Sequence, residues 1–226
     1  MFPLGDASRE TRRWPLVTIL IIAANFAVFA LELANGDDFI LRWSLVPANI
    51  VAGRDWITIL SSMFLHEGWE HILGNMLFLW AFGPEIEDAM GGFRYFVFYL
   101  LGGLAATIAQ VAIDPSSTVP QLGASGAIAA VMGAFLVTYP RDQIKTVFVL
   151  GWIIRVTFVP AAVLVGLWFV SQLFNEVGSL MKADSGGGVA YMAHIGGFVF
   201  GAVMARLFER SDDPGATGER RWAIGG

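Results

Sequence analysis

Long apolar runs, separated by shorter polar stretches, follow one another through most of this sequence. A helix that crosses a membrane needs about 20 predominantly apolar residues, because it must span roughly 30 Å of hydrocarbon. The apolar runs approach this length in six places, and we predict a membrane-spanning helix in each: 15–33, 71–88, 93–113, 125–139, 156–174 and 189–208. The pattern therefore predicts an all-α, polytopic membrane protein built as a six-helix bundle.

The segment between the first two predicted helices, residues 34–70, is too long for a tight turn and too apolar for a free loop. Its apolar runs at 39–41 and 56–60 favour short helices that are half-buried at the membrane surface. We therefore expect a long first loop that is partly embedded in the membrane.

The two ends of the chain complete the predicted domain organisation. Residues 1–14 are expected to form a cytoplasmic N-terminal tail, and residues 15–208 a single six-helix membrane domain. Residues 209–226 are rich in Asp, Pro, Gly and Arg, which is typical of a disordered tail, and we expect this tail in the cytoplasm.

Composition supports a membrane protein and excludes several other classes. Hydrophobic residues make up 56% of the 226 positions and charged residues 15%, whereas a soluble domain is about 25% charged. The net charge of −5, without a basic patch containing aromatic residues, argues against nucleic acid as a partner. Cysteine is absent, which excludes disulfides, thiolate metal sites and cysteine nucleophiles. Imidazole chemistry is restricted to His66, His71 and His194.

Lysine and arginine residues are distributed unevenly around the predicted helices, and this sets the expected orientation. One side collects Arg9, Arg12, Arg13, Arg94, Arg141, Lys145, Arg155, Arg206, Arg210, Arg220 and Arg221. The opposite side holds only Arg42, Arg54 and Lys182. Because the positively charged side faces the cytoplasm, we expect both termini there, in a multi-pass protein of the bacterial inner (plasma) membrane.

A cleavable signal peptide is the alternative for the first apolar run, because Arg12 and Arg13 precede it. The run is long for a signal peptide, and cleavage after Ala34 would place Glu32 where a small residue is required. We therefore expect this segment to remain in the protein as a helix.

The fourth predicted helix is short. It extends over 15 residues from Ser125 to Tyr139, where Pro140 ends it, and such a helix covers only about 22 Å. Since Arg141 anchors its cytoplasmic end, the Ser125 end is expected to lie below the outer membrane surface. Irregular backbone at that depth occurs only where it is buried in protein or lines a water-filled cavity. The length therefore predicts a recessed pocket around Ser125.

Ser125 and His194 are polar residues that open two apolar segments rich in small residues. Close helix packing is the alternative explanation for Ser125, and a structural hydrogen bond is the alternative for His194. Small residues continue the same helical face in both segments: Ala129, Gly133, Gly197 and Gly201. Two such faces approach closely, which would let the imidazole act as general base for the serine hydroxyl.

His71 and Asn75 are four residues apart and therefore share one face of the second predicted helix. Both side chains can donate hydrogen bonds to a developing oxyanion in a site of low dielectric constant. The alternative role for the pair is polar contact between helices.

A metal site is the alternative to this serine chemistry. Residues 66–71 read His-Glu-Gly-Trp-Glu-His, which nearly matches the zinc-protease pattern HExxH. The second histidine comes one residue late, and a spacing of five rotates it by about 140° around a helix, away from a shared ligand face. We therefore predict neither a metal nor another cofactor.

Three segments, residues 66–75, 123–126 and 193–197, resemble motifs of the rhomboid intramembrane serine proteases and occur in the same order. The resemblance covers residues 15–208. The resemblance implies a six-helix rhomboid-like bundle with a Ser125–His194 catalytic dyad and no third acid. It implies an oxyanion hole formed by the Ser125 backbone N–H with His71 and Asn75, and it matches Glu87 to a structural glutamate. The implied substrates are membrane proteins with a single spanning helix, cut near its outer end.

Two positions depart from the rhomboid pattern. The first loop often carries a Trp-Arg pair, but Trp56 is followed here by Ile57. Four residues after the nucleophile, many rhomboids have an aromatic residue that stacks on the catalytic histidine, but here the residue is Ala129. The orientation of His194 must therefore depend on other contacts.

Two other functions remain as alternatives: a non-catalytic membrane-binding or quality-control protein on the same scaffold, and a channel or transporter with a polar cavity. Retention of Ser125, His194, His71 and Asn75 favours the enzyme over both. We expect single-pass membrane proteins and membrane lipids as partners. The sequence determines neither the natural substrate nor the oligomeric state.

Overall fold

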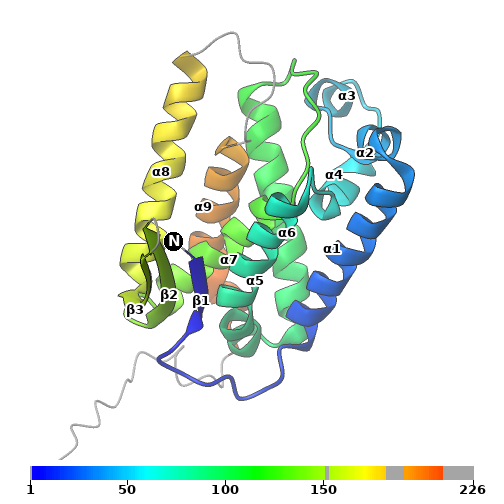
Figure 1. Ribbon diagram of the computed structural model, residues 1–226. Coiled ribbons are helices and arrows are strands. Elements are labelled where there is room, and N and C mark those ends of the chain that lie inside the picture. The colour runs from blue at the N-terminus through cyan, green and yellow to red at the C-terminus, as the bar shows by residue number, and fades with distance from the viewer. Residues whose placement is uncertain (1, 151–152, 182–190, 211–226) are drawn as a thin grey trace, which may run out of the picture.

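The computed structural model describes residues 2–150, 153–181 and 191–210 of the chain. Its long helices run roughly side by side, with α1 at one edge and α8 at the opposite edge (Figure 1). Their bounds are α1 Leu16–Asn35, α5 Trp69–Met90, α6 Gly92–Ile113, α7 Ser125–Thr138, α8 Ala161–Met181 and α9 Tyr191–Phe208. Each predicted segment therefore contains a helix. Most of the predicted C-terminal tail, residues 211–226, lies outside the described residues.

Three of the described helices, α1, α6 and α9, are long and apolar enough to cross a membrane. α7 and the segment Ala161–Phe174 of α8 are also apolar but shorter. The short length predicted for the helix that begins at Ser125 is confirmed, because α7 has 14 residues.

The segment between α1 and α5 contains four short helical elements: α2 Asp37–Trp43, α3 Pro47–Val51, α4 Thr58–Ser61 and the 3₁₀ helix η1 Ser62–Phe64. Backbone hydrogen bonds between Leu45 and Gln121 run in both directions at 2.9 and 2.7 Å and tie this segment to the loop before α7. The depth of these short helices in the membrane stays a prediction.

A three-stranded antiparallel sheet is the main departure from the all-α prediction. β2 (Gln143–Leu150) and β3 (Ile153–Pro160) form a hairpin, and β1 (Phe2–Asp6) pairs with β2 in the order β1-β2-β3. The predicted start of the fifth helix at residue 156 is therefore wrong, since α8 begins at Ala161. The N-terminal segment 1–14, predicted as a tail, contains β1.

The physical reason for this error is that hydropathy alone does not separate an apolar strand from an apolar helix. Strands β2 and β3 are rich in β-branched residues, which pack well on a pleated surface. Pro160 then marks the boundary, because proline cannot donate a ladder hydrogen bond but is compatible with the beginning of a helix.

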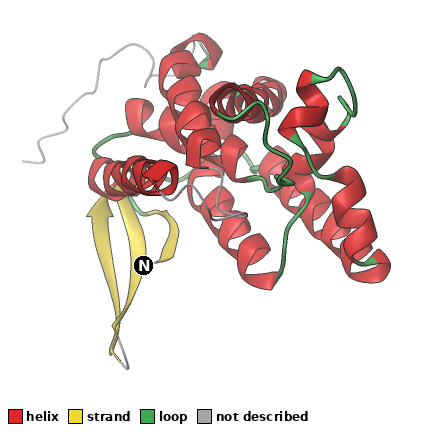
Figure 2. Cartoon of the chain, turned by 90° about the horizontal axis from the view of Figure 1, so that it is seen from above, coloured by secondary structure: helices red, strands yellow, loops and turns green. Residues whose placement is uncertain are grey.

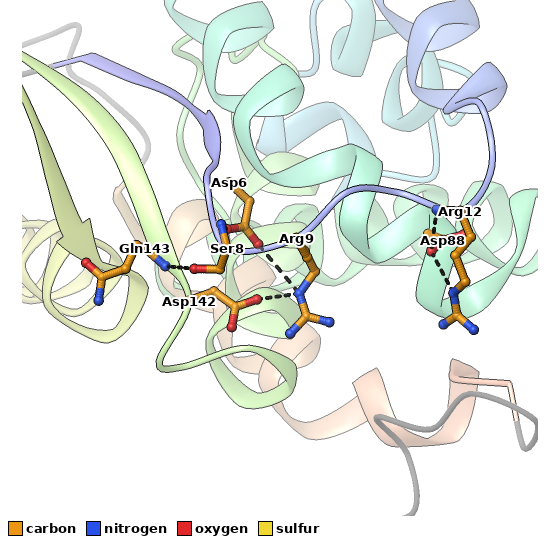
Figure 3. A network of polar contacts seen from close by, with 7 residues as sticks. All are labelled: Asp6, Ser8, Arg9, Arg12, Asp88, Asp142 and Gln143. Atoms are coloured by element: carbon orange, nitrogen blue, oxygen red, sulfur yellow. Dashed lines mark hydrogen bonds and ion pairs between the residues drawn. The ribbon is translucent and has the colours of Figure 1, made fainter. Parts of the chain in front are cut away.

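The chain after β1 is held by polar contacts to two distant segments (Figure 3). Arg9 Nε donates to Asp142 Oδ2 at 2.5 Å, and its guanidinium lies 3.8 Å from the centre of the Tyr139 ring. The Gln143 backbone N–H donates to Ser8 Oγ at 2.6 Å. Further along, Arg12 Nε lies 3.4 Å from Asp88 Oδ2. The N-terminal segment is thus attached to the ends of both α7 and α5.

Asp6 makes the pairing of β1 sensitive to pH. Burial raises the pKa of the Asp6 carboxyl from its ordinary 3.8 to about 6, because the charged form loses contact with water. A raised carboxyl pKa means that the native state binds more protons than the unfolded state. The contribution of Asp6 to the stability of the folded state is therefore most favourable below pH 3.8, and it declines as the pH rises to about 6.

We expect Asp6→Asn to slow hydrogen exchange of the β1 amides at pH 7.5, because asparagine carries no charge to desolvate. Its side-chain oxygen can still accept the bond that the Ser8 N–H donates to Asp6 at 2.7 Å. At pH 4 the difference from wild type should largely disappear. Exchange of residues 2–6, followed by mass spectrometry at both pH values, measures this. Faster exchange of the variant at pH 7.5 would contradict the explanation.

Helix α7 forms the centre of the bundle, with 11 of its 14 residues buried. Glycines allow α9 to approach it closely. A Cβ built on Gly197 would collide with the carbonyl oxygen of Gly126, and one on Gly201 with that of Ala130. The predicted packing of Gly197 and Gly201 against the Ser125 helix is confirmed, but the groups they meet belong to Gly126 and Ala130, each one position after the predicted Ser125 and Ala129.

Glu87, matched by resemblance to a structural glutamate, caps the beginning of α1. Its two carboxylate oxygens accept hydrogen bonds from the backbone N–H groups of Val17 at 2.9 Å and Thr18 at 2.7 Å. The Thr18 hydroxyl adds a bond of 2.8 Å. The first N–H groups of a helix have no intrahelical acceptor, so a carboxylate stabilises α1 here and joins it to α5.

Candidate active site

The site begins with the irregular backbone that leads into α7. Gly123 has φ = 126°, a conformation that glycine adopts without strain. Its N–H donates to the Ser62 carbonyl at 2.8 Å. A Cβ at this position would lie 2.9 Å from His71 Nε2 and 3.7 Å from Ser125 Oγ, so a side chain would fill the space between them. Ser125 then starts α7, where its N–H has no acceptor within the helix.

Ser125 and His194 are in direct contact. The Ser125 Oγ lies 2.7 Å from His194 Nε2, within the range of a strong hydrogen bond. The two residues are 69 positions apart in the chain, and the close approach of α7 and α9 brings them together. Ser125 is partly exposed, whereas the His194 side chain is buried.

Gln172 of α8 completes a chain of hydrogen bonds through the histidine. Its Oε1 lies 2.8 Å from His194 Nδ1. Its Nε2 donates to Ser171 Oγ at 3.0 Å and, more weakly, to the Trp168 carbonyl at 3.4 Å, which orients the amide oxygen toward the ring. An amide oxygen only accepts, so Nδ1 must carry the proton. The lone pair on Nε2 is then free to accept from the serine hydroxyl.

Gln172 and Trp168 are the residues that sequence reasoning missed. The ring centre of Trp168 lies 5.7 Å from that of His194. Trp168 and Gln172 share one face of α8, because they are four positions apart. The available signal was an amide inside an apolar predicted span, since polar residues there usually face protein or a cavity.

His71 and Asn75 present hydrogen-bond donors near Ser125. The Glu67 backbone N–H donates to His71 Nδ1 at 3.4 Å, so the proton of a neutral ring lies on Nε2, which faces Gly123. Asn75 is buried, and its Nδ2 has no hydrogen-bond partner among the described residues. A buried amide donor without a partner is energetically unfavourable unless another molecule provides the acceptor.

All four predicted site residues line one cavity of about 670 Å³: His71, Asn75, Ser125 and His194. Trp168, Phe78, Ile128 and Met132 contribute apolar parts of its wall. This volume lies within the usual range for ligand pockets, and the combination of an apolar wall with a few convergent polar groups is typical of them. A ligand in this cavity would lie next to Ser125.

The two histidines considered as metal ligands, His66 and His71, lie next to each other. The rings of His66 and His71 pack edge to face, with centres 5.0 Å apart. Within the described part of the chain, no three His, Asp or Glu side chains gather as metal ligands. The prediction that the chemistry needs no metal is left to experiment.

Comparison with known proteins identifies the family. The family model described as the Rhomboid domain matches residues 53–211, more than half of the chain. The chain belongs to the rhomboid family. Together with its apolar helices, this makes it an integral membrane protein.

Similar rhomboid proteins come from bacteria and from mitochondria. The chain is 28% identical over 188 residues to Rhomboid protein 1, mitochondrial, of Saccharomyces cerevisiae, covering 81% of this chain and 50% of that protein. It is 32% identical over 126 residues to Rhomboid protease GluP of Bacillus subtilis, covering 54% of this chain and 24% of that protein. It is 26% identical over 205 residues to Rhomboid protease GlpG of Salmonella choleraesuis, covering 90% and 66%. The chain thus spans half or less of the length of the first two relatives.

The two departures from the rhomboid pattern have visible structural counterparts in this chain. Ala129 is fully buried, and His194 instead contacts Gln172 and Trp168 of α8. In the first loop, Arg54 donates to Asn49 Oδ1 at 2.8 Å, and Asn49 Nδ2 donates to Asp55 Oδ2 at 2.9 Å. An arginine therefore ties this loop from a position before Trp56 rather than after it.

Proposed function

We propose that this rhomboid is an intramembrane serine endopeptidase that uses Ser125 and His194 as a catalytic dyad. The observation that carries the proposal is the 2.7 Å hydrogen bond from Ser125 Oγ to His194 Nε2, inside a cavity that also presents two donors. A structural hydrogen bond alone would not account for the buried, unpartnered Nδ2 of Asn75.

The mechanism follows from these positions. His194 Nε2 takes the proton from Ser125 as its oxygen attacks the peptide carbonyl, and the resulting imidazolium then protonates the leaving amine. The developing oxyanion is stabilised by the Ser125 N–H, His71 Nε2 and Asn75 Nδ2. Water activated by the same histidine hydrolyses the acyl-enzyme. Each step uses groups of the protein and water, so the proposed mechanism assigns no role to a metal or another cofactor.

The proposed setting of the reaction is a six-span membrane domain over residues 15–208, with cytoplasmic segments 1–14 and 209–226. Both termini lie in the cytoplasm of a bacterium, and the cavity opens toward the outer side of the inner membrane. The substrates are single-pass membrane proteins cut in or near the spanning segment, and lipids surround the domain. Support comes from the distribution of Lys and Arg and from the family.

We expect Asn75→Ala to reduce kcat less than the loss of a single oxyanion donor usually does. Such a loss costs about 10²–10³ in rate, but here the Ser125 N–H and His71 would remain. KM should change little, because the oxyanion forms only after binding. Steady-state cleavage of a single-pass substrate in detergent measures both constants. Unchanged kcat for Asn75→Ala, His71→Ala and the double variant would exclude both residues from the oxyanion site.

Gln172 is proposed as a positioning residue that keeps His194 in the required tautomer. Gln172→Met removes the acceptor at similar size, and we expect kcat to fall about tenfold with KM unchanged, the scale of one lost hydrogen bond. Gln172→Glu restores an acceptor and should recover much of the activity. Equal loss in both variants would indicate a packing role instead.

Covalent labelling of the purified protein tests the proposed function. A fluorophosphonate should react with wild type, and peptide mapping should place the adduct on Ser125. Ser125→Ala should remain unlabelled while melting at the same temperature. Labelling that persists in Ser125→Ala, or cleavage that a chelator stops and zinc restores, would overturn the serine mechanism.

A further inference from the structure

The three-stranded sheet has two different faces. In an antiparallel pair, directly opposed residues lie on the same face. The register pairs Phe2 with Val147, Val147 with Val156, Val149 with Ile154, and Lys145 with Phe158. One face therefore collects six apolar residues, called here the exposed sheet face: Phe2, Val147, Val149, Ile154, Val156 and Phe158. On the opposite face, Pro3, Ile144 and Thr146 are buried.

The exposed sheet face is uncovered. Its side chains are 48–68% exposed at Phe2, Val149, Ile154, Val156 and Phe158. Single exposed apolar residues are common, but a contiguous apolar patch is rare on a surface that faces water. The patch therefore indicates contact with something apolar.

The position of the sheet indicates what that partner is. β3 ends at Pro160 and α8 begins at Ala161, without a loop between them. Figure 1 shows the sheet beside the lower end of α8, and Figure 2 shows its strands projecting outward from the helices when they are viewed from above. The sheet projects sideways from the membrane bundle at the level where α8 begins. Lipid occupies the region beside a membrane bundle, so the sheet reaches into that region.

Helix α8, which follows β3 directly, also has exposed apolar side chains at Val163, Leu167, Val170 and Phe174. β3 is an edge strand, and its outer N–H and C=O groups need water, so the sheet belongs in the headgroup region rather than in the hydrocarbon centre. Exposed Lys145, which pairs with Phe158 on the same face of the sheet, suits that region, because its long side chain can reach anionic headgroups. Arg155 on the edge strand also disfavours pairing with a second sheet.

We propose that the exposed sheet face rests on the lipid bilayer, in the headgroup region on the side where α8 begins. The sheet then acts as a lateral support that fixes the depth of the start of α8. Strand β1 extends this support, and the contacts from Arg9 and Ser8 to the α7–β2 segment hold β1 in place. This inference does not depend on the proposed peptidase activity.

Spin labelling tests the proposal directly, because the chain has no native cysteine. Val156→Cys and Phe158→Cys place nitroxides on the exposed sheet face, and Arg155→Cys and Thr157→Cys are matched controls on the other face of the same strand. The full-length protein is reconstituted into vesicles of phosphatidylcholine and phosphatidylglycerol. Collision rates are then measured with oxygen, which concentrates in lipid, and with a nickel chelate, which stays in water.

We expect the oxygen-to-nickel ratio to alternate, several-fold higher at 156 and 158 than at 155 and 157. Ile154→Cys provides a replacement site if either apolar variant melts below wild type. High nickel accessibility at all positions would show a water-exposed sheet and overturn the proposal. Labels at 156 and 158 that neither reagent reaches would show a protein partner instead. If dilution with lipid restores access, that partner is a second copy of the chain.

Discussion

Ser125→Ala is expected to abolish cleavage of a single-pass membrane substrate, lowering kcat by about 10⁴-fold or more. Without the hydroxyl oxygen, no acyl-enzyme forms. The remaining groups can still bind the substrate and donate hydrogen bonds, but none of them replaces the nucleophile. His194→Ala should be nearly as damaging, because Ser125 loses the acceptor that lies 2.7 Å from its oxygen. The double variant should be no worse than the more damaging single variant, since the two residues act as one unit.

The experiment compares these variants with wild type and with Ser116→Ala in the same detergent. Ser116 is an exposed loop serine that bonds Asp114 at 3.1 Å, so its loss controls for removal of a hydroxyl away from the cavity. Each variant must melt within the range of wild type before its rate is interpreted. Cleavage retained by Ser125→Ala, or losses of the two single variants that multiply in the double variant, would be incompatible with a Ser125–His194 dyad.

The helices could be predicted from the sequence because the bilayer imposes a length on them. Apolar runs near 20 residues are visible without knowledge of any contact, and the boundaries of α1, α5 and α6 follow within two residues. The sheet could not be found in the same way. Residues 156–160 are as apolar as the helix that follows them, and the pairing of β1 with β2 joins segments about 140 residues apart.

The candidate site likewise contains residues that the sequence reveals and one whose role depends on the tertiary structure. Ser125, His194, His71 and Asn75 are recognisable because a polar group in an apolar segment requires an explanation. Gln172 was equally visible as a polar residue, but its role depends on the side of α8 that faces His194. That orientation is a tertiary property, and the displaced start of α8 made it harder to infer. The hydrogen bond of 2.8 Å to Nδ1 becomes evident only in three dimensions.

The packing of α7 against α9 leads to the second large expected effect. Gly197 lies one turn after His194 and faces the carbonyl oxygen of Gly126, the residue that follows Ser125. Gly201 repeats this contact one turn further along, against the carbonyl of Ala130. In both cases an added methyl group meets backbone, which cannot rotate away as a side chain can. The two helices must therefore separate to accommodate any larger residue.

We expect Gly197→Ala and Gly201→Ala each to lower stability by about 1–3 kcal/mol, the usual cost of overpacking. The rate of cleavage should fall by more than the loss of folded protein explains, because a displacement of about 1 Å at reacting atoms can reduce the rate about 10²-fold.

Gly166→Ala on α8 is the matched control, since a Cβ there meets nothing within 4 Å. Thermal unfolding and cleavage are measured for all three variants at a temperature where each remains folded. Gly166→Ala should match or exceed wild-type stability, because alanine favours a helix over glycine. If Gly197→Ala also retained wild-type stability and full cleavage, close approach of the two helices at Gly197 would not be what positions Ser125 against His194.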